Sequence, residues 1–198
     1  FVWADLVTDD VAAAQKFYTG LFGWQFYDYG GYLIGRNDDR PLCGIFYRPR
    51  PKDKATKPRW FSYLSVPNVK RAVKAATDAG GKVLEPPKKL PKRGEQAVIA
   101  DPEGALFGVV KASAGDQPDF LADLGDWIWI ELISRNGSQA GKFYKAVGGY
   151  EVMENTSSNR ASDYVLASEG YARATILTVS PEREKVNPTW VMFVRVNN

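Results

Sequence analysis

The sequence predicts an α+β fold built from tandem βαβββ modules, and two observations lead to this prediction. The first is an internal repeat at a constant offset of 126 residues. The matched pairs include Trp3 and Trp129, Leu6 and Leu132, Phe17 and Phe143, Tyr18 and Tyr144, and Gly23 and Gly149. The second is that each repeat opens with a strand-like run, followed by apolar residues at helical spacing. We interpret the chain as a duplication.

A weaker repeat divides each half again. Residues 58–64 recur as residues 188–194, and both segments are aromatic, strand-like runs. The chain therefore contains about three modules and the first strand of a fourth, so we expect the last module to be incomplete in this chain. We predict a first domain over 1–111, a linker over 112–124 and a second domain over 125–198.

Turn and cap residues place the elements of the first two modules. In the first module, Asp9 or Asp10 can cap a helix that begins near Val11 and ends at Gly23. In the second, a helix begins near Val69 and stops at Gly80. Strands are expected at 2–8, 24–28, 32–35, 42–47, 60–66, 97–100 and 105–111. The basic residues Lys88, Lys89, Lys92 and Arg93 are interrupted by Leu90 and Pro91, which favours a solvated loop.

Composition excludes several classes of site. The chain has no histidine, so the commonest metal ligand and general base are both missing. The single cysteine, Cys43, lies in an apolar run, which indicates a buried thiol and excludes a multi-cysteine zinc site. The net charge of +3 gives no reason to expect a nucleic-acid partner. No apolar stretch is long enough to cross a membrane, and there is no signal-peptide pattern.

The first residues bear on localisation. The chain begins at Phe1 within a strand-like run and without a methionine, which suggests that the N-terminus has been trimmed. The missing signal peptide is therefore weak evidence about the compartment. A cytoplasmic location is the default expectation.

Three motifs resemble the vicinal oxygen chelate superfamily, the group of glyoxalase I, bleomycin-resistance proteins and extradiol dioxygenases. They are Trp3-Ala4-Asp5-Leu6-Val7-Thr8-Asp9, then Phe17-Tyr18 with Leu21-Phe22-Gly23-Trp24, and Ala97-Val98-Ile99-Ala100-Asp101-Pro102-Glu103-Gly104-Ala105. The resemblance is closest to its two-domain members. It implies modules paired into curved half-barrel sheets, with a small organic molecule as partner.

The resemblance also implies where a metal would be held. Its ligand positions fall on Trp3, Phe61, Gly108 and Trp129 in this chain. None of these side chains can ligate a divalent metal. We therefore expect no metal site and no cofactor, although a register error of one or two residues would leave carboxylates or amides as the only available ligands.

Alternation along the strands selects the candidate site residues. Trp3 and Asp5 share the concave face of the first strand, and Leu6 packs beneath the helix from the other face. Equivalent reasoning adds four further residues, so the candidate ligand-binding set is Trp3, Asp5, Phe61, Tyr63, Trp129 and Glu131. Aromatic side chains could instead simply fill the core. Either carboxylate could be a salt-bridged structural residue, with Arg173 and Arg195 as candidate partners.

Three functions follow from this reading. We prefer a metal-free protein that binds an aromatic or apolar organic ligand in the concave sheet cleft. The alternatives are an atypical metal-dependent lyase, isomerase or dioxygenase, and a degenerate scaffold that acts in assembly. Whether the chain is an enzyme stays open, as does self-association as a homodimer through an open sheet edge.

Overall fold

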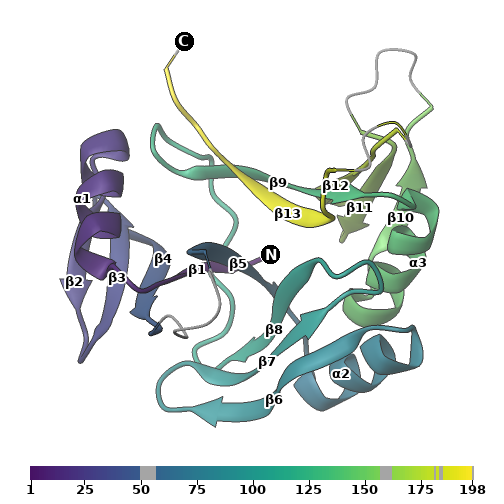
Figure 1. Ribbon diagram of the computed structural model, residues 1–198, viewed down its shortest axis with the longest axis horizontal. Helices are drawn as coiled ribbons and strands as arrows, with labels where there is room; N and C mark the ends of the chain where they lie inside the picture. Colours follow the sequence, from purple (N-terminus) through teal and green to yellow (C-terminus); the bar gives the residue numbers. More distant parts are fainter. Residues whose placement is uncertain (50–56, 157–161, 181, 183–184, 198) are drawn as a thin grey trace. The chain divides into compact units, whose positions relative to one another are not determined.

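The computed structural model describes all residues except 50–56, 157–161, 181, 183–184 and 198 (Figure 1). The helices are α1 (Val11–Phe22), α2 (Val69–Asp78) and α3 (Gly137–Gly148). The strands of the first two modules are β1 (Trp3–Thr8), β2 (Gln25–Asp28), β3 (Tyr32–Asn37), β4 (Arg40–Tyr47), β5 (Arg59–Ser65), β6 (Lys82–Leu90), β7 (Gly94–Ala100) and β8 (Leu106–Ala112). The later strands are β9 (Trp127–Ser134), β10 (Glu151–Glu154), β11 (Tyr164–Ser168), β12 (Tyr171–Thr178) and β13 (Thr189–Val194).

The chain forms two compact units, and each is continuous in space but not in sequence. The smaller unit consists of residues 3–62, 119–128 and 193–198. The larger unit consists of residues 1–2, 63–118 and 129–192. The predicted division into sequential domains at 112–124 stays a prediction.

The smaller unit contains four neighbouring strands of one sheet, with α1 on one face. Its strand order is β2-β3-β4-β1, with β1 parallel to β4 and the other neighbours antiparallel. Leu6, Leu33 and Ile45 form its core against the apolar residues of α1. This confirms that Leu6 faces the helix, and it places Trp3 and Asp5 on the opposite face of β1.

The segment 119–128 is held firmly in this unit. The Trp24 indole Nε1 donates to the Gly125 carbonyl at 2.7 Å. The carboxylate of Asp126 is buried, accepts from Asn37 Nδ2 at 2.8 Å and forms an ion pair with Arg40. Asn37 Nδ2 also donates to the Leu124 carbonyl at 2.8 Å, so the last residue of the expected linker is hydrogen-bonded to the first module.

The larger unit combines two groups of strands with α2 and α3. One group has the order β5-β8-β7-β6, and the other has the order β10-β11-β12-β9-β13. Helix α2 packs against α3, and the two lie side by side in Figure 1. A shared core of buried apolar residues, among them Leu64, Phe107, Leu132, Tyr144 and Leu166, joins both groups of strands to these helices.

A buried hydrogen-bond chain reinforces this packing. The Asp101 carboxylate accepts from the Ala105 amide at 2.8 Å and from the Tyr144 hydroxyl at 3.1 Å. The Tyr144 hydroxyl accepts in turn from Trp190 Nε1 at 2.9 Å. Burial raises the pKa of the Asp101 carboxyl and that of the Tyr144 phenol, because each charged form would lose its hydration.

The capping residues at both ends of α1 and α3 match, which supports the duplication. Asp10 caps α1 through a bond from the Ala13 amide to its carboxylate, and Asn136, 126 residues later, caps α3 in the same way. Both helices end at a left-handed glycine, Gly23 with φ 77° and Gly149 with φ 72°. The predicted helices are confirmed.

One expectation was wrong. Lys88 and Lys89 lie on strand β6, which pairs antiparallel with β7, and not in a solvated loop. Strand β6 ends its sheet, and its pairing shifts register around Pro86 and Pro87. Proline is tolerated at such an edge because its missing N–H faces away from the ladder. The lysines stay exposed, as expected.

Candidate functional site

The smaller unit holds a closed polar cluster around Asp5 on β1. The Asp5 side chain is almost fully buried, with 1% of its surface exposed. Its Oδ1 accepts from Trp3 Nε1 at 2.8 Å and from the Tyr32 hydroxyl at 2.7 Å. The Trp3 indole also reaches the Tyr32 oxygen at 3.0 Å. A buried carboxylate needs such donors, since it has lost its hydration.

Gly44 makes room for this cluster. It lies directly opposite Asp5 on the parallel neighbour β4. A Cβ at this position would stand 2.0 Å from the Tyr32 hydroxyl oxygen and 2.4 Å from Asp5 Oδ1. Only glycine lets the phenol reach across β4 to the carboxylate.

The larger unit holds an equivalent cluster around Glu131 on β9. Thr175, on the parallel neighbour β12, lies opposite Glu131. The Thr175 hydroxyl accepts from Trp129 Nε1 at 2.9 Å and donates to Glu131 Oε2 at 2.9 Å. The Ser162 hydroxyl donates to the same oxygen. The predicted pair Trp129 and Glu131 is thus brought together, and both side chains are half-buried.

The hydrogen-bond partners of Glu131 are hydroxyl groups. Hydroxyl groups satisfy it, and among the described residues neither Arg173 nor Arg195 forms an ion pair with it. Arg173 lies at a bulge of β12, with its guanidinium 5.4 Å from the centre of the Tyr171 ring. Arg195 donates to the Ala122 carbonyl. The alternative of a salt-bridged carboxylate thus finds no ion pair to Glu131 among the described residues.

Phe61 and Tyr63 are both buried, with 8% and 3% of their surfaces exposed. The Tyr63 ring covers Gly108, where a Cβ would come within 2.2 Å of the ring. The Arg93 guanidinium lies 4.6 Å from the centre of the same ring, which is the geometry of a cation–π contact. Tyr63 is therefore packed between glycine and arginine.

The residues present do not fit a metal ion. Trp3, Phe61, Gly108 and Trp129, where the superfamily's ligands would stand, offer no donor atom. In the described part of the chain, no three Cys, Asp or Glu residues gather in a way that could hold one. The oxygens of Asp5 and Glu131 that are engaged bind Trp, Tyr, Ser and Thr donors instead.

Cys43 is not a candidate nucleophile. Its side chain is fully buried, as expected. Burial, and to a smaller extent the charge of Asp5, raises the pKa of the Cys43 thiol far above its usual range.

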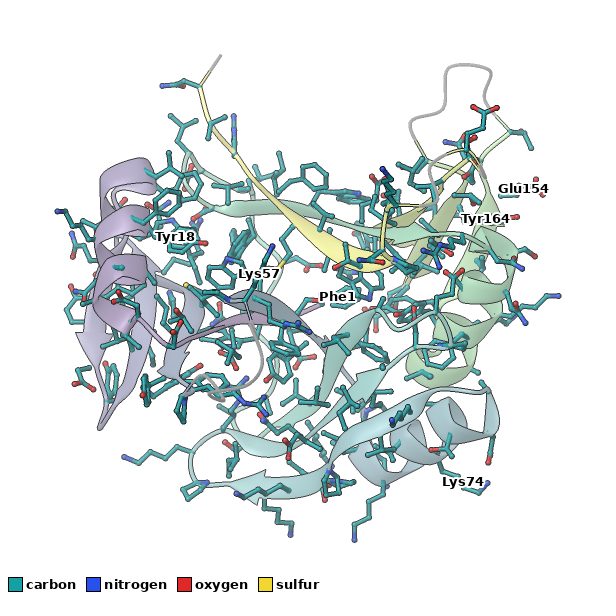
Figure 2. The ribbon with its side chains drawn as sticks, in the orientation of Figure 1. Phe1, Tyr18, Lys57, Lys74, Glu154 and Tyr164 are labelled. Carbon is teal, nitrogen blue, oxygen red and sulfur yellow. The ribbon has the colours of Figure 1, made fainter. Side chains whose placement is uncertain are left out.

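A separate hollow of about 430 Å³ opens at one end of the larger unit. It is lined by Glu154, Asn155, Asp163, Tyr164, Thr178, Val179 and Ser180. Figure 2 shows the side chains of Glu154 and Tyr164 there, on β10 and β11. The Thr178 amide donates to the Asp163 carboxylate at 2.6 Å, so part of the acidic lining is already engaged.

The sequence reading missed Tyr32, Ser162 and Thr175. Tyr32 and Thr175 share the open face of their strands with the carboxylates they contact, so alternation combined with strand register would have found them. Ser162 lies just before β11 and is found only from the three-dimensional arrangement. Among the described residues, no helix is long and apolar enough to cross a membrane.

Comparison with known proteins agrees with this fold. The family model of the Glyoxalase/Bleomycin resistance protein/Dioxygenase superfamily matches residues 1–109. Among solved structures, the chain superimposes on an extradiol ring-cleaving dioxygenase from Brevibacterium fuscum with a TM-score of 0.62 and 13% identity, covering 89% of this chain and 52% of that one. The Mn(II)-bound glyoxalase from Novosphingobium aromaticivorans gives a TM-score of 0.60 and 19% identity, covering 89% and 60%.

Curated relatives are more similar in sequence. A Mycobacterium tuberculosis protein named "Putative glyoxylase CFP32" is 32% identical over 153 residues. The anthracycline biosynthesis protein DauV of Streptomyces sp. strain C5 is 31% identical over 163 residues. In each case the match covers 74% of this chain and 59% of the relative, so the chain spans well under two thirds of the length of these relatives.

Proposed function

This chain belongs to the glyoxalase/bleomycin resistance/dioxygenase superfamily, and from that premise we propose that it is a metal-free protein that binds a planar aromatic or apolar organic molecule. The proposed binding surface of the larger unit is the sheet face that carries Trp129 and Glu131, and Tyr63 belongs to the same unit. The corresponding proposed residues of the smaller unit are Trp3, Asp5 and Phe61.

One observation carries the proposal. The Trp129 indole and the Glu131 carboxylate lie side by side on one strand face, and each is only half-buried. The bond from Trp129 Nε1 to Thr175 Oγ1 holds the indole in one orientation. A fixed aromatic surface beside a carboxylate gives a ligand stacking area together with a polar contact, which is the usual composition of small-molecule sites.

The relatives support the class of ligand. DauV is named for anthracycline biosynthesis, and anthracyclines are planar and polycyclic. A flat ring system of this kind can stack on the half-buried indole of Trp129.

A thermal-shift screen tests it. We expect at least one planar polycyclic aromatic compound to raise the melting temperature, because a ligand at 100 times its Kd stabilises the folded state by about 2.7 kcal/mol. The Trp129→Leu variant should lose the shift, and Lys70→Ala, an exposed change on α2, should keep it. No shift across a broad panel, or an equal shift in Trp129→Leu, would contradict the proposal.

Elemental analysis distinguishes the alternative, a metal-dependent enzyme, from the proposed metal-free binding protein. Protein purified without chelator should contain much less than one equivalent of Mn, Fe, Ni or Zn, since the superfamily's ligand positions carry no donors. A stoichiometric metal, together with turnover of thiol adducts of 2-oxoaldehydes, would favour the enzyme instead. Sizing of the purified chain addresses the scaffold alternative.

A further inference from the structure

We infer that the site on β9 selects a cationic ligand, and that Glu131 Oε1 is the atom that binds the ligand's ammonium group. This inference rests on the proposed function and names the ligand class for the same face. The ligand would be an aromatic molecule that carries a protonated amine, with its ring on Trp129 and its nitrogen at Glu131.

The hydrogen bonds around Glu131 leave its two oxygens unequal. Oε2 accepts from both the Thr175 and Ser162 hydroxyls. Each hydroxyl has a single proton, and Thr175 uses its oxygen to accept from Trp129 at the same time. Both protons therefore go to Oε2, and no described residue donates to Oε1. Within the described part of the chain, Oε1 is therefore the oxygen that can accept from solvent or from a ligand.

Among the described lysines and arginines, none forms an ion pair with the Glu131 carboxylate. Arg173, on the neighbouring strand, instead packs against the Tyr171 ring. A half-buried carboxylate held by two neutral hydroxyls keeps its negative charge available, and a cation is the ligand that gains most from it.

Trp129 favours the same class of ligand. The face of an indole attracts cations more strongly than that of any other side chain. Its N–H donates to Thr175, so a ligand would contact the part of the half-buried ring that stays accessible. The indole and the carboxylate, two residues apart on one face of β9, would thus contact the ring and the neighbouring ammonium group of the same ligand.

The experiment compares three probes that share one ring system: 1-naphthylmethylamine, 1-naphthylmethanol and 1-naphthylacetate. Binding to the whole chain at pH 7 is followed by NMR at the Trp129 indole N–H, assigned with Trp129→Phe. We expect the amine to bind at least tenfold more tightly than the alcohol, and the acetate to bind most weakly.

Glu131→Gln keeps the shape of the side chain and both hydroxyl contacts but removes the charge. It should lower amine affinity about tenfold and leave alcohol affinity unchanged. Glu151→Gln, an exposed change on β10, matches the change in net charge and should have no effect. In the wild type, a higher salt concentration should weaken binding of the amine but not binding of the alcohol. This tests the role of the charge without any variant.

The outcomes separate the two proposals. If amine and alcohol bind equally, or if Glu131→Gln leaves their ratio unchanged, the cation inference is overturned while aromatic binding stands. If none of the probes, nor any compound of the thermal-shift panel, moves the Trp129 indole, the proposed function fails together with the inference.

Discussion

Asp5 and Glu131 occupy equivalent positions, 126 residues apart, on the first strand of their modules, yet their surroundings differ. Asp5 is almost fully buried and accepts from an indole and a phenol. Glu131 is half-buried and accepts from two aliphatic hydroxyls, both through one oxygen. The duplication has thus kept the tryptophan and the carboxylate while changing how exposed the charge is.

A single position on the neighbouring strand accounts for much of this difference. Gly44 lies opposite Asp5, and Thr175 lies opposite Glu131. Glycine leaves space for Tyr32 to cover the carboxylate with its ring, whereas threonine fills that space with a short hydroxyl of its own. The first arrangement closes the site and the second leaves it open, which is why the ligand proposal concerns Glu131.

The largest effect expected from this comparison is on stability. Asp5→Ala removes the buried carboxylate that the half-buried Trp3 and Tyr32 donors share, so it should lower the free energy of unfolding by about 3 kcal/mol. Glu131→Ala should cost about 1 kcal/mol, since water can replace a half-buried carboxylate. Urea unfolding measures both. Equal costs would show that the two sites are equally closed and would remove the contrast.

Gly44→Ala comes next. Its Cβ would overlap both the Tyr32 oxygen and the Asp5 carboxylate, and we expect a loss of about 2 kcal/mol from overpacking. Gly20→Ala is the matched control, because Gly20 lies within α1 and a Cβ there meets no atom within 4 Å. That change should stabilise the protein by about 0.5 kcal/mol. A tolerated Gly44→Ala would mean that Tyr32 need not lie where it does.

These sites also indicate how far the sequence could be read. Apolar spacing and cap residues predicted the helices near Val11 and Val69 and the cap of the first at Asp9 or Asp10, because these depend on local chemistry. The repeat offset predicted the pairing of Trp3 with Trp129. Alternation placed Asp5 and Glu131 on the open faces of their strands. Tyr32 was missed because its contact crosses a strand and depends on the absence of a side chain at Gly44. Strand β6 was missed because two prolines concealed an edge strand.

A smaller effect is expected when the residues around Asp5 are replaced by the residue types found around Glu131. Gly44→Thr combined with Tyr32→Ser gives the smaller unit a threonine and a serine like those around Glu131. The double variant should recover about 1 kcal/mol relative to Gly44→Thr alone, since removing the phenol relieves the overlap. A double-mutant cycle by urea unfolding measures this coupling. Additive costs would argue that the two positions do not interact.

The smallest expected effect is on the pH dependence of stability. It depends on a position at which the two modules carry different residues. Cys43 lies beside Gly44 in the smaller unit, and Ala174 lies beside Thr175 in the larger unit. Burial raises the pKa of the Cys43 thiol in the folded state. The contribution of this group to the free energy of unfolding is therefore fully present below the pKa of the unfolded chain, near 9, and is lost as the pH rises above that value. At pH 9.5 the wild type should lose about 1 kcal/mol relative to pH 7 from this group.

Cys43→Ala makes the smaller unit like the larger one at this position, and it should remove that part of the alkaline loss. The measurement is urea unfolding at pH 7 and pH 9.5 for both proteins, under reducing conditions. Tyr144 and Tyr150, whose pKa values burial also raises, begin to contribute only nearer pH 10 and are common to both proteins. An identical pH slope in the variant would show that the thiol ionises equally in the folded and unfolded chains, and that the core beneath Asp5 is open to water.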